Sequence, residues 1–254
     1  MAFWICVAVA FGLNWLVFVP SNVARTERYF DLTGAATYLT VTALALLLAD
    51  ELDTRSYVLG ALVAIWALRL GTFLFRRVVK AGHDRRFDKI KNDVKSFFIT
   101  WTLQGLWVSL TAGAALAAIT SDSQHSFGAL GFVGLGIWLA GFAIEVVADA
   151  QKSQFRSDPA NSGRFITTGL WAWSRHPNYF GEIVLWIGVA LIALPALDGL
   201  WYLTLVSPLF VTLLLTRISG IPMLERGAAK RWGDEPEYRQ YVQSTPVLVP
   251  RPPR

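Results

Sequence analysis

Long apolar runs alternate with short polar segments along the whole chain. Most of these runs are long enough to cross ~30 Å of hydrocarbon as an α-helix that rises ~1.5 Å per residue. The pattern predicts an all-α, polytopic membrane helical bundle of about seven transmembrane helices. The last two runs are short and close together, so a re-entrant pair is the alternative. The predicted spans are Met1–Val19, Leu32–Ala49, Tyr57–Phe75, Phe97–Ile119, Phe127–Ala148, Ile183–Leu197 and Leu200–Leu215.

The basic residues concentrate in every second loop. Arg25 and Arg28 follow the first span, residues 76–95 carry eight Lys and Arg, residues 151–179 carry four, and residues 217–254 carry seven. These segments together hold 21 of the 23 basic residues. By the positive-inside rule, this distribution predicts an N-terminus outside and a cytoplasmic C-terminal tail. We therefore expect a multi-pass integral membrane protein, in the inner membrane if its source is bacterial.

Composition agrees with the membrane class and narrows the chemistry. The chain is 54% hydrophobic and 16% charged, and it has eleven tryptophans; its mean hydropathy is +0.43. A soluble domain of this length carries more charge. The single cysteine, Cys6, excludes an intrachain disulfide. The sequence has no P-loop, no G-x-G-x-x-G after a strand and no zinc-type spacing, so a nucleotide site must be built another way. We expect no metal and no nucleic-acid partner.

We interpret residues 1–254 as a single membrane domain with three parts. Residues 1–96 hold the first three spans and the substrate side, residues 97–219 hold the cofactor-binding spans, and residues 220–254 form the cytoplasmic tail, with a short helix around Pro222–Trp232. The fifth span is rich in glycine, which predicts a close helix-packing face. Its glycines are Gly128, Gly131, Gly134, Gly136 and Gly141.

The densest group of polar and aromatic side chains, GLWAWSRHPNYFGE at Gly169–Glu182, lies directly before an apolar run. Pro177 suits the first turn of the following helix, and the N–H groups of that turn would face a phosphate from the loop side. An interfacial belt explains the aromatic residues but not Asn178 and Glu182. We predict a polar ligand site here. Its candidate residues are Arg175, His176, Asn178, Tyr179 and Glu182.

Ionisable residues in or beside the other spans point to the same membrane level. Glu145 and Asp149 are four residues apart on the fifth span and share one helix face, and Arg156 follows two turns later. With Glu182 and Arg217 they predict a water-accessible cavity open to the cytoplasm; a structural ion-pair network is the alternative.

The loop at residues 82–95 has a separate set of basic residues. Arg85 and Arg86 suit phosphates or the headgroups of acidic membrane lipids.

A family resemblance rests on these residues. GLWAWSRHPNYFGE, the upstream acids and Arg156, and the downstream RISGIPMLE, EYRQYV and VP resemble the C-terminal half of the steroid 5α-reductase superfamily, and more narrowly its bacterial DUF1295 branch. TERYFDLTGAATYL also resembles that branch. Sterol C14 reductases and isoprenylcysteine carboxyl methyltransferases share the RHPNY-like core, so the core leaves both NADPH and S-adenosylmethionine open.

The resemblance implies a helical bundle that holds NADPH in a cytoplasm-facing cavity. It implies that Asn178 and Glu182 hold the nicotinamide end or its neighbours. Two positions depart from the animal steroid enzymes, which have an amide at the place of Glu145 and an aromatic hydroxyl at the place of Glu225. The cofactor residues implied are Glu145, Asp149, Arg156, Arg175, His176, Asn178, Tyr179, Glu182, Arg217, Tyr238 and Tyr241.

Reduction of a C=C bond conjugated to a carbonyl needs hydride at the β carbon and a hydrogen-bond donor at the carbonyl oxygen. In the animal enzymes a tyrosine of the third span is the donor, but Trp66 occupies that position here. We predict Tyr38 as the substitute, backed by Glu27 or Asp31. The alternative for Tyr38 is an interface anchor. The lipophilic small-molecule substrate would enter from the membrane lipids between spans.

Three functions follow. The first is an NADPH-dependent reductase of a steroid-like or other lipophilic enone. The second is an S-adenosylmethionine-dependent methyltransferase, whose tail pattern is also present as Glu225, Gly233, Tyr238, Tyr241 and Pro250. The third is a non-catalytic lipid-binding protein. The order of Asp149, Arg156 and Arg217 favours the reductase, because a dinucleotide phosphate needs arginines that a methyl donor does not.

Overall fold

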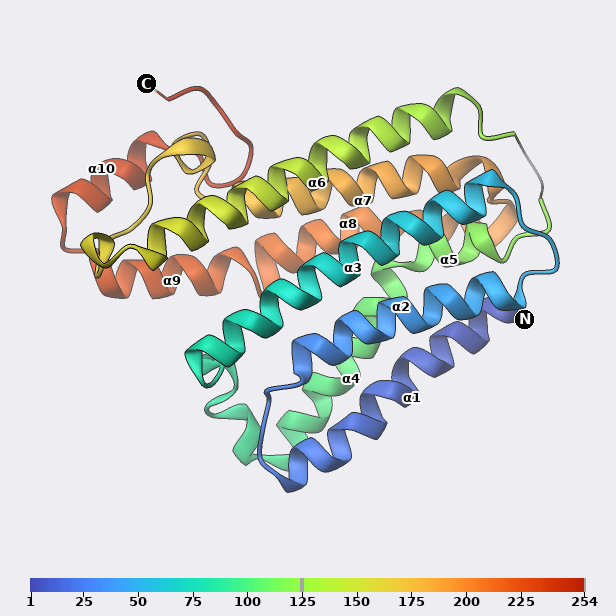
Figure 1. Cartoon of the computed structure of the whole chain (residues 1–254), viewed down its shortest axis with the longest axis horizontal. Helices are drawn as coiled ribbons and strands as arrows, with labels where there is room; N and C mark the ends of the chain where they lie inside the picture. Colours follow the sequence, from blue (N-terminus) through green and yellow to red (C-terminus); the bar gives the residue numbers. More distant parts are fainter. Residues whose placement is uncertain (124–125, 254) are drawn as a thin grey trace. The chain divides into compact units, whose positions relative to one another are not determined.

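The computed structural model describes residues 1–123 and 126–253, without the side chain of Arg85 (Figure 1). Over these residues the chain is all-helical and has no strand, as predicted. Six helices are long and apolar enough to cross a membrane, or seven when the bent pair α4 and α5 counts as one span. The helices are α1 (Ala2–Val23), α2 (Phe30–Leu48), α3 (Thr54–Ala81), α4 (Val94–Thr111), α5 (Gly113–Ile119), α6 (Gly128–Ser157), α7 (Pro177–Ala193), α8 (Ser207–Leu213), α9 (Ile221–Trp232) and α10 (Pro236–Ser244).

Capping aspartates and a proline explain where three of the helices begin. The carboxylate of Asp53 accepts a hydrogen bond from the N–H of Ser56 at the start of α3, and Asp93 does the same for Ser96 at the start of α4, each at 2.8 Å. Both are N-caps that satisfy a donor the helix leaves unpaired. Helix α7 begins at Pro177, as predicted from its fixed φ. Short 3₁₀ helices cover Arg85–Phe87, Ile90–Asn92, Pro159–Asn161, Gly169–Ala172, Leu194–Ala196 and Gly199–Val206.

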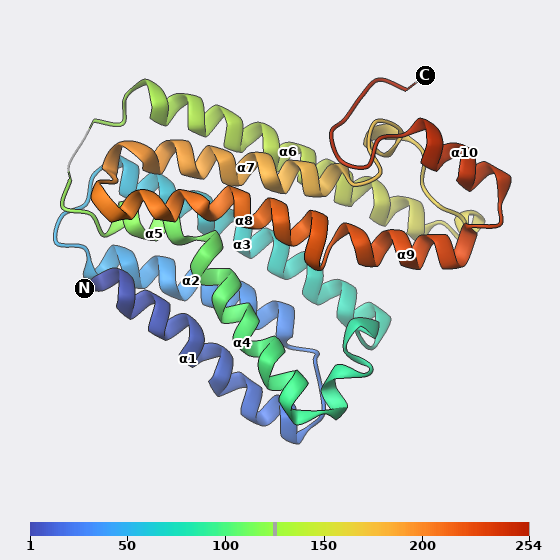
Figure 2. The same ribbon diagram turned by 180° about the vertical axis from the view of Figure 1, so that it is seen from behind.

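The described chain divides into two compact units. The first comprises Met1–Phe132 with Val189–Ser207, and the second comprises Val133–Gly188 with Pro208–Arg254. In the first unit α2 packs against α1 and α3, and α1 also packs against α4. The two opposite views in Figures 1 and 2 both show α1 and α2 side by side. A buried aromatic cluster of Phe30, Phe87, Phe97 and Trp101 closes the end of this unit where the α1–α2 and α3–α4 loops meet.

The predicted continuous span Phe97–Ile119 is broken. Helices α4 and α5 meet at Ala112 with a bend of 55°. The hydroxyl of Ser207 donates a hydrogen bond to the carbonyl oxygen of Thr111. A side chain that takes a carbonyl out of the helical ladder is a common cause of a kink. Every residue of the short helix α5 is buried, so the bend directs a small-residue helix into the core of the first unit.

Helices α6 and α7 approach closely through glycine in the second unit. A Cβ atom at Gly181 would lie 2.6 Å from the carbonyl oxygen of Gly141, and one at Gly188 would lie 2.6 Å from the carbonyl oxygen of Gly134. Only glycine allows backbones to meet at such distances. The predicted glycine face is therefore correct for Gly134 and Gly141.

The same prediction is wrong for the other three glycines of α6. A Cβ atom at Gly136 would meet nothing within 4 Å, one at Gly128 would meet only Ser126, and one at Gly131 would meet the ring of Phe127. These positions lie off the helix face that meets α7, because a helix of 3.6 residues per turn presents only some of its glycines to one neighbour.

The tail is more structured than predicted. The predicted short helix around Pro222–Trp232 is confirmed as α9. It follows a π-helical turn at Leu214–Ile218, and π turns are frequent at functional sites. Sequence reasoning missed α10.

Candidate functional site

The loop between α6 and α7 is fastened to α6 by hydrogen bonds. The side chain of Gln151 accepts from the N–H of Leu170 at 2.9 Å, and the indole N–H of Trp171 donates to the carbonyl oxygen of Ala148 at 3.0 Å. Gly169 has a φ of +61° and lies against the Gln151 amide, where a side chain would be both strained and crowded. These contacts fix the start of the RHPNY sequence relative to α6.

A tail segment after α10 is hydrogen-bonded to the same sequence. The N–H of Arg175 donates to the carbonyl oxygen of Pro246 at 2.9 Å. The buried hydroxyl of Ser174 donates to the carbonyl oxygen of Leu248 at 2.8 Å, and the N–H of Arg251 donates to the carbonyl oxygen of Trp173 at 3.0 Å. Residues 246–251 thus form a strap over Trp173–Arg175.

Asp149 and Asn178 are the first pair of predicted residues that the structure brings together. The amide nitrogen of Asn178 donates to a carboxylate oxygen of Asp149 at 3.1 Å, across 29 residues of sequence. Glu145, one turn before Asp149 on α6, is 2% exposed. A Cβ atom at Gly181 would lie 2.7 Å from the backbone nitrogen of Glu145, so Glu145 lies where α6 and α7 come closest. Glu182, next to Gly181, is half-buried.

Arg175 and His176 form a second group, around Glu225 of α9. The Nε2 atom of His176 lies 2.8 Å from one oxygen of Glu225, and Arg175 pairs with the other oxygen at 3.2 Å. The rings of His176 and Tyr179 stack with their centroids 5.7 Å apart. Burial lowers the pKa of His176, and Glu225 only partly opposes this effect. These effects together favour the neutral imidazole.

The tail tyrosines belong to an aromatic cluster. Tyr238 and Tyr241 both contact the ring of Phe165, and Trp232 contacts Phe165 and Tyr238. The hydroxyl of Tyr241 donates to the carbonyl oxygen of Trp171 at 2.7 Å. Burial raises the pKa of both tyrosines, so both phenols stay protonated. The structure thus places the tyrosine rings in the packing between the α6–α7 loop and α10.

Two of the predicted cofactor residues, Arg156 and Arg217, lie at the surface. Arg156 is exposed near the end of α6, and Arg217 is exposed in the π-helical turn. A cavity of about 440 Å³ opens beside the end of α6, but none of the predicted site residues lines it. Its walls come from α6 and the following loop: Gln151, Gln154, Phe155, Ser157, Asp158, Asn161, Ile166, Thr168 and Gly169.

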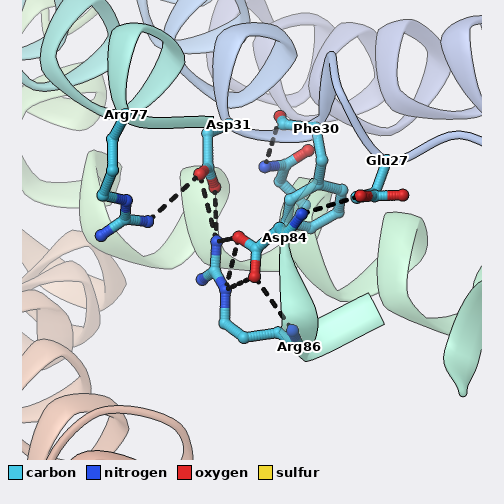
Figure 3. Close-up of polar contacts among 7 residues, drawn as sticks. Glu27, Phe30, Asp31, Arg77, Asp84 and Arg86 are labelled. Atoms are coloured by element: carbon cyan, nitrogen blue, oxygen red, sulfur yellow. Dashed lines mark hydrogen bonds and ion pairs between the residues drawn. The ribbon is translucent and has the colours of Figure 1, made fainter. Parts of the chain in front are cut away.

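The predicted catalytic carboxylates lie in the first unit, in a network with the basic α3–α4 loop (Figure 3). Glu27, whose side chain is 3% exposed, pairs with Lys91 at 2.8 Å and accepts from the N–H of Asp84 at 2.9 Å. Arg86 bridges Asp84 and Asp31, with 3.1 Å to Asp31. Burial opposes ionisation of Glu27, but Lys91 and the Asp84 N–H outweigh it and lower the pKa of Glu27. Arg85, the other phosphate candidate of this loop, has a side chain that lies outside the described residues.

Tyr38 lies on α2, about two turns after Asp31. Its ring meets the ring of Trp66 edge to face, with centroids 5.0 Å apart. Tyr38 follows Asp31 by seven positions in the helix, which corresponds to ~10 Å along the axis. The structure thus places Tyr38 against Trp66, and places the two carboxylates in the loop network.

Replacing Lys91 with methionine is expected to lower the free energy of unfolding by about 2–3 kcal/mol near pH 7, because it leaves a buried carboxylate without its cation. The folded-state pKa of Glu27 lies below its ordinary value of 4.5, so its stabilisation is present above that pH and is lost as the pH falls through the folded value. Thermal unfolding in detergent at several pH values measures the difference. Lys89→Met, at an exposed position in the same loop, is the control. A difference that stays constant into acid would contradict the role of Glu27.

Sequence reasoning missed the contacts of two residues. In the sequence, Glu225 was noted only as a departure from the animal steroid enzymes and as part of the methyltransferase tail pattern. In the structure it is the partner of both Arg175 and His176. Lys152 counted only as a basic residue, although its ammonium group lies 4.0 Å above the ring of Trp171. The sequence held one signal for Glu225: it lies about one turn after Pro222, near the start of the helix that follows the last span.

The chain belongs to the steroid 5α-reductase-like superfamily of membrane proteins. The chain is a member of the DUF1295 family within it, because the family model, described as a protein of unknown function (DUF1295), matches residues 17–245.

One curated relative is the uncharacterized protein C594.04c of Schizosaccharomyces pombe, which is 24% identical over 173 residues. The match covers 58% of this chain and 50% of that protein, so the chain spans half the length of this relative. No solved structure matches the chain.

Proposed function

We propose that the protein is an NADPH-dependent membrane reductase that acts on the activated C=C bond of a steroid-like or other lipophilic enone. The observation that carries the proposal is the hydrogen bond between Asn178 and Asp149. A carboxylate only accepts, so the Asn178 amide must turn its nitrogen toward Asp149 and its oxygen away. The oxygen is then oriented to accept an N–H bond from the carboxamide of a nicotinamide.

Charge supports a nucleotide at this site. Arg156 lies on α6, seven residues after Asp149, and Arg217 lies in the π-helical turn; both are exposed, and an arginine can form paired bonds with phosphate oxygens. Bound NADPH would supply hydride, and the protein would supply orientation and a donor to the carbonyl oxygen. Tyr38 is our candidate for that donor. Its contact with Trp66 supports this choice, because Trp66 stands where the animal enzymes carry their tyrosine.

A methyltransferase is the second candidate. The contact between His176 and Glu225 joins two sequence elements that this chain shares with the isoprenylcysteine carboxyl methyltransferases. Such a protein would bind S-adenosylmethionine in place of NADPH. A lipid-binding protein without catalytic activity is the third reading.

Thermal unfolding of the purified protein with NADPH, NADH or S-adenosylmethionine separates these functions. A ligand that binds only the folded state raises stability by an amount set by the ratio of its concentration to its dissociation constant. We expect stabilisation by NADPH. Stabilisation by S-adenosylmethionine alone would replace the reductase with the methyltransferase, and no response to any ligand would favour the lipid-binding protein.

Asn178→Ala is expected to weaken NADPH binding about tenfold, because one hydrogen bond to a ligand contributes ~1.4 kcal/mol. Titration calorimetry measures the Kd, and thermal unfolding checks that the variant folds. Asn92→Ala in the α3–α4 loop, which removes a bond from the Asn92 amide to the backbone of Asp88, is the matched control. Equal affinity of Asn178→Ala and wild type would show that Asn178 does not hold the cofactor.

A further inference from the structure

His176 is held in one orientation by contacts on three sides. Its side chain is 5% exposed. The ring stacks on Tyr179, and the backbone N–H of His176 donates to the hydroxyl of Ser174 at 3.1 Å. Ser174 is in turn tied to the strap by its bond to Leu248. Burial and the stack on Tyr179 therefore restrict rotation of the imidazole.

Glu225 determines which ring nitrogen carries the proton. A carboxylate accepts and does not donate, so the 2.8 Å contact requires a hydrogen on Nε2 of His176. The carboxylate is fixed as well, because Arg175 binds its second oxygen at 3.2 Å and also donates to the carbonyl oxygen of Val242 at 3.2 Å. In the neutral ring, the other nitrogen, Nδ1, then carries a lone pair and acts as an acceptor.

Nδ1 of His176 is buried and has no hydrogen-bond partner among the described residues. Burying an acceptor without a donor costs free energy, and native structures keep such atoms where a ligand or water completes them. His176 lies two residues before Asn178, whose amide is bonded to Asp149. The position of Nδ1 and its empty acceptor capacity are those of a ligand contact.

We propose that Nδ1 of His176 accepts a hydrogen bond from an N–H or O–H group of the bound ligand, and that Glu225 is the positioning residue that holds His176 in the tautomer able to do so. The inference rests on the proposed function, under which the donor is the nicotinamide carboxamide or a ribose hydroxyl of NADPH. It assigns Glu225, which takes the place of an aromatic hydroxyl in the animal enzymes, a task in ligand binding.

The electrostatic surroundings of His176 agree with a neutral ring. Burial and the nearby cations of Lys152 and Arg175 lower the pKa of His176, while the carboxylate of Glu225 raises it, and the lowering effects prevail. A protonated ring would donate from both nitrogens and could not accept from the ligand.

Two substitutions of His176 separate the two ring nitrogens. His176→Gln places an amide group near the position of Nε2, so it keeps a donor to Glu225 and removes the acceptor at Nδ1. His176→Asn places its amide near the position of Nδ1, so it keeps an acceptor there and removes the bond to Glu225. We expect the Kd for NADPH to rise about tenfold in His176→Gln and less than about threefold in His176→Asn. Equal losses in both variants, or no loss in either, would overturn the proposal.

A spectroscopic measurement reads the tautomer directly. In protein labelled with ¹⁵N-histidine, we expect His176 to be neutral with its proton on Nε2, identified by the loss of its signals in His176→Gln. Glu225→Leu is expected to redistribute the proton between the two nitrogens. NADPH is expected to shift the Nδ1 resonance of the wild type. A wild-type ring that is charged, or that carries its proton on Nδ1, would overturn the proposal.

The same titration distinguishes this proposal from the proposed function. If NADPH stabilises the protein but leaves the Nδ1 resonance unchanged, the acceptor role of His176 is wrong and the reductase assignment stands. If S-adenosylmethionine alone binds and shifts Nδ1, the acceptor role stands and the reductase assignment is wrong. If neither ligand binds, both proposals are wrong.

Discussion

Replacing Gly181 with leucine is expected to lower the free energy of unfolding by more than about 3 kcal/mol, and Gly181→Ala by about 1–3 kcal/mol. The first added carbon would lie 2.6 Å from the carbonyl oxygen of Gly141 and 2.7 Å from the backbone nitrogen of Glu145. Neither atom belongs to a flexible side chain, so the helices α6 and α7 would have to move apart. Thermal unfolding in detergent and the yield of monodisperse protein measure the effect.

Gly136→Leu is the matched control for this prediction. Gly136 lies on the same helix as Gly141, but a Cβ atom there meets nothing within 4 Å. We expect this variant to unfold near the wild-type temperature, because a helical glycine in open space is replaced at little cost. If both leucine variants behaved alike, the close approach of α6 and α7 would not be what Gly181 provides.

Tyr38→Phe is expected to lower kcat about a hundredfold or more, because a hydrogen-bond donor at a developing oxyanion contributes on this scale. Phenylalanine keeps the ring that meets Trp66, so the unfolding temperature should stay close to that of the wild type. NADPH oxidation with an enone that the wild-type protein reduces measures the rate. Tyr57→Phe, at an exposed position near the start of α3, is the control.

The position of Trp66 offers a second test of the same donor. Under the resemblance to the animal steroid enzymes, Trp66→Tyr restores a hydroxyl where those enzymes carry it. We expect this change to return part of the activity of Tyr38→Phe. A Tyr38→Phe variant with the wild-type rate would leave Tyr38 as a packing residue or an interface anchor.

The helices were predictable where the signal is local. Apolar runs coincide with the helices they specify, which is why α1 and α2 match the predicted spans to within four residues at each end, whereas α3 continues six residues beyond the predicted end at Phe75. Helix α10 also had local signals, a proline at its start and Tyr238, Tyr241 and Val242 spaced three and four residues apart, but its polar composition resembled that of a loop.

The break at Ala112 was not predictable in the same way. The hydroxyl that takes up the carbonyl of Thr111 comes from Ser207, 96 residues later. The hydropathy of residues 97–119 shows only an uninterrupted apolar run. A contact between distant residues leaves no trace in a local pattern.

In the candidate site too, local features were predictable and contacts between distant residues were not. Helical spacing placed Glu145 and Asp149 on one face, and the structure has both buried on α6. The partners of Arg175 and His176 come from α9 and the strap, which sequence spacing does not bring near them. For Glu27 and Asp31, the many basic residues of the α3–α4 loop were visible, but their pairing with these two carboxylates depends on how two loops fold against each other.

The glycine contacts between α6 and α7 also limit how the second unit can move. Backbones that touch at Gly141 and Gly181, and again at Gly134 and Gly188, cannot slide or rotate past one another without collision. Helices α6 and α7 must therefore move together as one rigid element. Under the proposed function, a motion that admits the ligand to Asn178 and His176 would therefore involve α9, α10 and the strap, which are attached by hydrogen bonds and ion pairs.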